Sequence, residues 1–354
     1  MAARPAACLR PVLAAGACLA LLGCMPPSSD PPSGTVPVPP ASTTYVPTPG
    51  TGESGPTGSR ATTASSTIAE GSTSLPATPS RTPARASFDT KSAHQDVAAL
   101  ARIGPRDAVS RAYARAAAYV QRRFEDAGYT VQRQSVPMPA GVSWGVAVSS
   151  GTTTNVVADP PGFDPRAPHV VIGAHLDTVP QAPGAEDNAS GVAVLIGLAR
   201  MLAQEPAGLP VRLVAFGGEE ARGGNGTLYA FGSRHYAAAL SRSERRAIRG
   251  MVALDRVGVE ASSVPVCAGM RGTEALAETM RSAARRAGIA THGCRDKASD
   301  HVSFEAVGIP VARLGKVPYA AYHSRADTLH VVDSAQLGRT AGVVWAWLRS
   351  LEAS

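Results

Sequence analysis

Beyond about residue 88, the pattern of apolar and polar positions alternates between two kinds of segment. Short apolar runs are typical of buried strands, and they occur at residues 155–158, 169–174, 211–216, 250–254 and 309–314. Apolar residues at helical spacing predict helices at residues 111–127, 190–202, 231–240, 273–287 and 335–351. Strands that alternate with helices favour an α/β fold, a three-layer sandwich whose mixed, largely parallel central sheet is flanked by helices.

Polar loops follow these strands, at the sheet edge where ligands bind in folds of this kind. The strand at 169–174 leads to His175 and Asp177, whose spacing of two places them on one face. A metal-binding imidazole usually donates its other N–H to a carboxylate, and Asp177 is well placed to accept it. A purely structural histidine–aspartate pair explains the same spacing.

Three further loops contribute carboxylates. Asp187 precedes a predicted helix, where its side chain would either cap the helix or bridge two cations. Glu219 and Glu220 are adjacent after a buried strand, an arrangement that is costly unless positive charge lies beside them. Asp255 ends another apolar strand.

A fifth polar loop contains Tyr322 and His323. Together the loops supply two histidines and several carboxylates but no thiolate. This mixture of nitrogen and oxygen ligands suits catalytic zinc, with manganese or cobalt as alternatives, and argues against a closed structural site.

Seven short segments strengthen this hypothesis because of the order in which they occur: His-Leu-Asp-Thr-Val, Asp-Asn-Ala-Ser-Gly, Gly-Glu-Glu, Gly-Ser-Arg-His-Tyr, Leu-Asp-Arg-Val-Gly, Ser-Asp-His-x-x-Phe and Tyr-His-Ser-x-x-Asp-Thr. In these segments the chain resembles the co-catalytic di-zinc aminopeptidase family, the type of the bacterial secreted leucyl aminopeptidases, with glutamate carboxypeptidase and glutaminyl cyclase as relatives. The resemblance covers residues 88 to 354 and implies a zinc-exopeptidase domain there.

The resemblance also implies a set of ligands. One Zn²⁺ would be held by His175 and Asp255, the other by Glu220 and His323, with Asp187 bridging the two.

Three other residues receive catalytic roles from the resemblance. Glu219 would be the general base, Asp177 the partner that orients the first histidine, and Tyr322 a hydrogen-bond donor to the oxyanion. Glu186 and Arg256 depart from the residues common in the family, which leaves the specificity open more than the activity.

The function that follows is a metal-dependent exopeptidase that removes N-terminal residues from peptides. A glutaminyl-cyclase-like acyltransferase is an alternative, disfavoured by the Asp-Asn-Ala-Ser-Gly loop and by Tyr322 in place of Trp. A glutamate-type carboxypeptidase is another, if Arg313 reaches a substrate carboxylate. A non-catalytic binding domain is disfavoured by the intact ligands and by Glu219.

The N-terminus has the layout of an export signal. Residues 1–23 contain Arg4 and Arg10 and then a short apolar stretch that ends at Leu-Leu-Gly-Cys. This ending resembles a bacterial lipobox and predicts that Cys24 is lipidated, although an ordinary secretory signal with a chance cysteine fits the same residues. We therefore expect an exported protein, lipid-anchored in the cell membrane and facing outside the cytoplasm.

Residues 24–87 are predicted to be a disordered tether. Between residues 25 and 86, 42 of 62 residues are Pro, Ser, Thr or Gly. Such a composition cannot bury enough apolar surface to offset the entropy that ordering the segment would cost. Of the five cysteines, Cys267 and Cys294 remain once the signal and Cys24 are set aside. In an oxidising compartment these two favour one disulfide, with two separate buried thiols as the alternative.

The charge and the apolar runs of the chain limit the classes of partner that we expect. The formal net charge of +7 comes mainly from scattered arginines without a Lys/Arg block, which gives no support to nucleic-acid binding. No apolar run beyond the N-terminus approaches the roughly 20 residues of a membrane-spanning helix, so a multi-pass membrane protein is excluded. We expect a monomer that acts on peptides.

Overall fold

The computed structural model describes residues 86–223, 228–272 and 274–351. The predicted export signal, Cys24 and almost all of the predicted tether lie outside these residues. Within the described ranges, the helices are too short or too polar to span a membrane.

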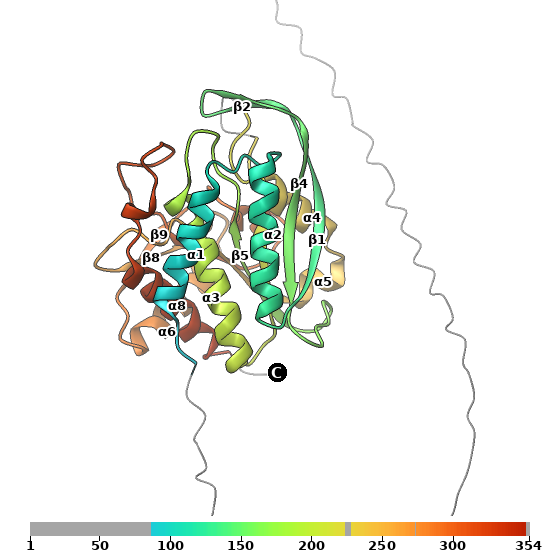
Figure 1. The fold of residues 1–354 in the computed structure, drawn as a ribbon. Helices are drawn as coiled ribbons and strands as arrows, with labels where there is room; N and C mark the ends of the chain where they lie inside the picture. Colours follow the sequence, from blue (N-terminus) through green and yellow to red (C-terminus); the bar gives the residue numbers. More distant parts are fainter. Residues whose placement is uncertain (1–85, 224–227, 273, 352–354) are drawn as a thin grey trace, which may run out of the picture. The chain divides into compact units, whose positions relative to one another are not determined.

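An eight-stranded sheet forms the centre of the fold, in the spatial order β1-β4-β6-β5-β7-β10-β8-β9 (Figure 1). Its strands are β1 (Thr130–Met138), β4 (Gly151–Asp159), β5 (His169–His175), β6 (Val211–Phe216), β7 (Ile248–Asp255), β8 (Val264–Ala268), β9 (Thr291–Arg295) and β10 (Val311–Gly315). The four central strands, β6, β5, β7 and β10, are parallel, whereas β1, β4 and β8 join through antiparallel pairs. The mixed sheet with a parallel centre is confirmed.

Helices cover both faces of the sheet. They are α1 (Thr90–Ile103), α2 (Arg111–Asp126), α3 (Gly191–Gln204), α4 (Phe231–Ala239), α5 (Arg242–Ala247), α6 (Glu274–Arg286), α7 (His301–Glu305) and α8 (Ser334–Leu348). Alternate residues of a strand point to opposite faces. Ile172 of β5 thus packs in the large apolar cluster under α1, α2, α3, α6 and α8, while Val171 packs with Tyr236 of α4 and Phe304 of α7. Three layers result, as predicted.

The predicted strands and helices are present, with ends that differ by a few residues. Among the elements that the pattern did not indicate are α1, the edge strands β1 and β9, and β8. Strand β9 is mostly polar and lies at the edge of the sheet, so it lacks the apolar run of a central strand. It pairs with β8 in a register that places Cys294 opposite Cys267, and a disulfide joins the two residues.

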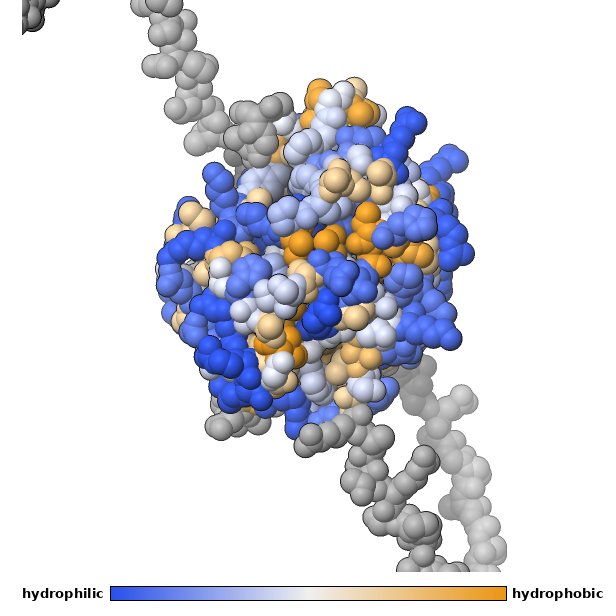
Figure 2. Space-filling model, turned by 90° about the vertical axis from the view of Figure 1, so that its left-hand side faces the viewer, coloured by the Kyte–Doolittle hydropathy of each residue, from blue (hydrophilic) through white to orange (hydrophobic). Residues whose placement is uncertain are grey.

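The surface is mainly hydrophilic on the side shown in Figure 2, where apolar side chains form patches of limited extent. A separate two-stranded hairpin, β2 (Gly141–Ser143) and β3 (Val146–Val148), lies between β1 and β4 in the chain. Figure 1 shows it beyond the end of the sheet, at the far side from the point where the chain enters α1.

Candidate metal centre

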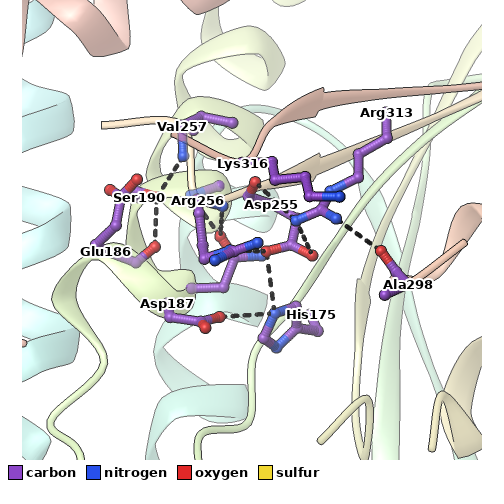
Figure 3. A network of polar contacts seen from close by, with 12 residues as sticks. His175, Glu186, Asp187, Ser190, Asp255, Arg256, Val257, Ala298, Arg313 and Lys316 are labelled. Carbon is purple, nitrogen blue, oxygen red and sulfur yellow. Dashed lines mark hydrogen bonds and ion pairs between the residues drawn. The ribbon is translucent and has the colours of Figure 1, made fainter. Parts of the chain in front are cut away.

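The parallel strands bring the predicted site residues to one edge of the sheet. His175 is the last residue of β5 and is 1% exposed. Its Nδ1 lies 3.2 Å from the backbone oxygen of Asp177, which leaves Nε2 directed toward the carboxylates beyond the strand. Figure 3 shows Asp187 and Asp255 converging on this imidazole.

Asp187 lies in an irregular turn between β5 and α3, and its backbone is held by another carboxylate. The Asp327 side chain accepts the N–H groups of Glu186, at 2.8 Å, and of Asp187, at 3.1 Å. The start of helix α3 packs tightly against β7. A Cβ on Gly191 would lie only 2.4 Å from the Leu254 carbonyl oxygen. This close approach brings Asp187 near the end of β7.

Asp177 positions the adjacent glutamates rather than only the first histidine. Its two oxygens accept the backbone N–H groups of Glu219 and Glu220, each at 3.0 Å, while its carboxylate is 3.8 Å from Nδ1 of His175. The predicted orienting contact to His175 therefore comes from the Asp177 backbone carbonyl, and the side chain fixes the loop after β6.

Asp255 ends β7 between two arginines. Arg313, 1% exposed, is 3.0 Å from the Asp255 carboxylate and also pairs with Asp296 at 2.7 Å. Arg256 lies 3.8 Å from the other Asp255 oxygen. Burial opposes the charged form of Asp255, but the arginines and His175 outweigh it and hold the pKa of Asp255 well below its usual value.

His323 completes the arrangement from the loop after β10. Its Nε2 is 3.2 Å from one Asp187 oxygen and 3.4 Å from Glu220. The other Asp187 oxygen is 3.1 Å from Nε2 of His175. The same nitrogen is 3.7 Å from a carboxylate oxygen of Asp255. Asp187 thus belongs to two sets, each consisting of one imidazole nitrogen and two carboxylate oxygens, and it supplies one oxygen to each set.

These donor sets fit two divalent cations. A tetrahedral zinc ion with bonds of about 2.0–2.2 Å keeps its ligand atoms roughly 3.3–3.6 Å apart. The nitrogen–oxygen separations in the two sets are 3.1, 3.7, 3.2 and 3.4 Å, and all the ligand atoms of each set lie within 4.8 Å of one another. His175, Asp187 and Asp255 would hold one ion, and Asp187, Glu220 and His323 the other.

The buried carboxylates also shift the pKa values of neighbouring groups. Burial opposes the imidazolium form of His323, but Asp187 and Glu220 raise its pKa to about 10. Burial raises the pKa of Glu219 well above its usual value; His175 opposes this rise, and the charges of Asp255 and Glu220 add to it.

The remaining candidates have more peripheral places. Tyr322 is 40% exposed, and its ring stacks on the His323 imidazole with centroids 3.7 Å apart. Arg256 lies over the same tyrosine ring, 4.5 Å from its centroid. Glu186 is fully buried, and its carboxylate accepts the N–H groups of Gly258 and Val259, so it does not face the site.

Several positioning residues carry no signal in the sequence by themselves. Arg106 is fully buried and donates to the carbonyl oxygens of Leu176, Pro183 and Gly184, which fixes the loop that precedes Asp187. Asp327 differs from Arg106 in this respect, because it belongs to the Tyr-His-Ser-x-x-Asp-Thr segment that contributes to the family resemblance.

Asp300 is 1% exposed and forms no ion pair among the residues that the structure describes. Burial raises its pKa to about 7.

The fold and the donor sets define an α/β protein with a candidate two-metal centre at the carboxyl edge of its sheet. Residues 155–348 match Peptidase family M28, and because this match covers more than half of the chain, the chain belongs to that family.

Curated relatives include Aminopeptidase YwaD of Bacillus subtilis, 29% identical over 211 residues, which are 56% of this chain and 45% of the relative. The Probable lipoprotein aminopeptidase LpqL of Mycobacterium tuberculosis is 27% identical over 258 residues, 62% of this chain and 49% of the relative. The matched part of the chain spans about half the length of these relatives.

Solved structures share the fold. The zinc aminopeptidase BSAP from Bacillus subtilis gives a TM-score of 0.66 at 20% identity and covers 77% of this chain and 98% of its own. A glutaminyl cyclase from Bacteroides thetaiotaomicron gives 0.64 at 19% identity, with 75% and 99% covered. The fold alone therefore does not distinguish a peptidase from a cyclase.

Proposed function

We propose that the chain is an exported metallo-aminopeptidase that hydrolyses N-terminal residues from peptides. The observation that carries this proposal is the position of Asp187, whose two oxygens face two separate histidine–carboxylate sets. Membership of Peptidase family M28 and relatives named as aminopeptidases support it.

Two cations at this centre, Zn²⁺ or alternatively Mn²⁺ or Co²⁺, would polarise the scissile carbonyl and lower the pKa of a water molecule. Glu219 would accept the proton of the attacking water and return it to the leaving amine. Its place supports this role, because Asp177 fixes its backbone while its carboxylate lies with His175 and Glu220 in one cluster. Tyr322 would donate a hydrogen bond to the oxyanion.

The carboxypeptidase alternative loses its main support. It requires Arg313 to bind a substrate carboxylate, but this side chain is buried and engaged by Asp255 and Asp296. The cyclase alternative remains compatible with the fold and has to be tested by assay.

Anchoring through Cys24 would leave the site accessible. Ala86 donates its N–H to Glu205, which follows the 14-residue helix α3. This helix begins at Gly191 beside the metal centre, and its length of about 21 Å places Ala86 at the opposite end of the sheet. A tether that joins there would connect to the end far from the centre.

The test is a panel of aminoacyl anilides, N-acetylated anilides, peptides with a free C-terminus and N-terminal glutaminyl peptides. We expect release of aniline from free aminoacyl anilides, its loss with a chelator, and its return with Zn²⁺. The acetylated anilides are the matched control, and they should not react. Activity restricted to cyclisation of glutaminyl peptides, or to cleavage at the C-terminus, would contradict the proposal.

A further inference from the structure

The β2–β3 hairpin presents a tryptophan at its tip. Val142 pairs with Ala147 and Ser143 with Val146, so Trp144 and Gly145 form a two-residue turn, with φ of 46° and 84°. Turns with positive φ at both positions favour Asn-Gly or Asp-Gly. A bulky tryptophan at the first position is therefore disfavoured by the backbone, and at 53% exposure its ring gains little from burial.

The ring of Trp144 instead contacts a candidate metal ligand. It meets the imidazole of His323 edge to face, with centroids 4.2 Å apart and planes at 73°. Tyr322 stacks on the same imidazole with planes at 24°. Two aromatic side chains, one from the hairpin and one from the loop itself, thus contact the His323 ring.

The two histidines of the centre differ in what orients them. Nδ1 of His175 has the Asp177 carbonyl oxygen at 3.2 Å. Nδ1 of His323 is buried and has no hydrogen-bond partner among the residues that the structure describes. Metal-binding histidines are normally oriented by a hydrogen bond from the second ring nitrogen. At His323, aromatic packing takes the place of that bond.

The hairpin is fixed to the loop that carries the other ligand of the same set. Arg222, 2% exposed, donates to the carbonyl oxygens of Pro139 at 3.0 Å and Ser149 at 2.7 Å, on the two sides of the hairpin. A Cβ on Gly141 would lie 2.0 Å from the Arg222 carbonyl oxygen, so the backbones touch. Arg222 follows Glu220 by two residues, and the hairpin is therefore built onto the Glu220 loop.

We propose that Trp144 is a positioning residue for the metal set formed by Asp187, Glu220 and His323, an inference that rests on the two-metal centre of the proposed function. Its ring restricts rotation of the His323 imidazole and keeps Nε2 directed at Asp187 and Glu220. The set of His175 and Asp255 has its own hydrogen bond and does not depend on the hairpin.

The test compares Trp144→Asn with Trp144→Phe. Asparagine suits the first position of this turn, so the hairpin is retained while the ring is lost. Phenylalanine keeps an aromatic ring. Val146→Ala, at another exposed position of the hairpin, is the matched control. Each protein, freed of metal by a chelator, is titrated with Zn²⁺ and with Co²⁺ followed by its visible spectrum.

We expect two binding events in the wild-type protein and in Val146→Ala. Trp144→Asn should weaken one event by about 10–100-fold, the effect typical of losing a group that orients a ligand, and leave the other unchanged. Trp144→Phe should restore most of the lost affinity. Affinities in Trp144→Asn that are unchanged from the wild type at both sites would overturn the inference. Equal weakening of both sites would also overturn it.

The titration needs no substrate, so the two proposals fail in different ways. Two normal binding events in Trp144→Asn, with a change only in KM or in substrate preference, would show that Trp144 contacts substrate and would leave the aminopeptidase proposal intact. Fewer than two ions in the wild-type protein would overturn both.

Discussion

Asp187 and the two glutamates show how single residues divide the work of the site. Asp187 faces both imidazoles, whereas Glu220 lies 3.4 Å from His323. Glu219 belongs to neither of the two histidine–aspartate sets and lies with His175 and Glu220 in a third cluster. Asp177 holds the backbones of both glutamates in place through two equal hydrogen bonds. Adjacent acids that share one support can therefore have different roles.

The first prediction separates those roles. Glu219→Gln keeps the shape but removes the base, so both metal ions should stay bound while kcat falls by about 10²–10⁴-fold. Glu220→Gln should instead weaken the binding of one ion. Metal content per chain and steady-state kinetics on an aminoacyl anilide measure both effects. Loss of an ion from the Glu219 variant, with two retained by the Glu220 variant, would reverse the assignment.

The second prediction concerns pH in the metal-free protein. The pKa of His323 rises to about 10 in the folded chain because Asp187 and Glu220 outweigh the effect of burial. An unfolded histidine titrates near 6.5. A raised pKa stabilises the fold fully below the unfolded value, and this contribution is lost as pH rises through about 10.

We therefore compare the metal-free wild type with His323→Gln by denaturant unfolding at pH 6 and pH 10. The free energy of unfolding of the wild type should exceed that of the variant by more at pH 6 than at pH 10. A difference that is equal at the two pH values, or larger at pH 10, would show that the carboxylates do not stabilise the imidazolium.

At the scale of elements, the edge of the sheet is held differently from its centre. The central strands are buried on both faces, and every residue of β5 is buried. Strand β9 is polar and only partly buried, so apolar contacts secure it poorly. The disulfide to β8 supplies a covalent link at this edge.

The third prediction follows from that link. Cys267 and Cys294 are 27 residues apart, and closing a loop of this length in the unfolded chain contributes roughly 3 kcal/mol on chain-entropy estimates. The double variant Cys267→Ser, Cys294→Ser should lower the free energy of unfolding by about 2–4 kcal/mol. The wild type in reducing agent should match the variant. No loss of stability, or two free thiols in the denatured, unreduced protein, would contradict this expectation.

At the scale of the whole domain, Ala86, the first residue that the structure describes, and the metal centre lie at opposite ends of the sheet. Helix α3 connects the two, from Gly191 beside the centre to Glu205 beside Ala86. A tether that joins the domain at Ala86 would attach at the end opposite the centre.

The fourth prediction tests lipidation. Replacing Cys24 with Ala removes the acceptor of the lipid, so the protein should leave the membrane fraction or keep its signal sequence. Cell fractionation with mass spectrometry of the mature form measures both. Replacing Cys18, within the predicted signal, is the matched control and should change neither. Unchanged membrane association and mass in the Cys24 variant would rule out the anchor.

The sequence by itself determined the central strands, the main helices and the order of the polar loops. Apolar runs report burial directly, and parallel strands bring their carboxyl ends to one edge, so His175, Asp187 and Asp255 could be placed together without coordinates. The edge elements could not be found in this way, because strand β9 has a polar surface and depends on pairing and on a disulfide.

Only the tertiary structure decided how the site is supported. Arg106 and Arg222 hold loops through contacts between residues far apart in the chain, and such contacts leave no local pattern. The same holds for Trp144, because nothing in the neighbouring sequence indicates a contact with a metal ligand. Its meeting with His323 arises because the hairpin and the loop after β10 reach the same end of the sheet, and only folding brings them there.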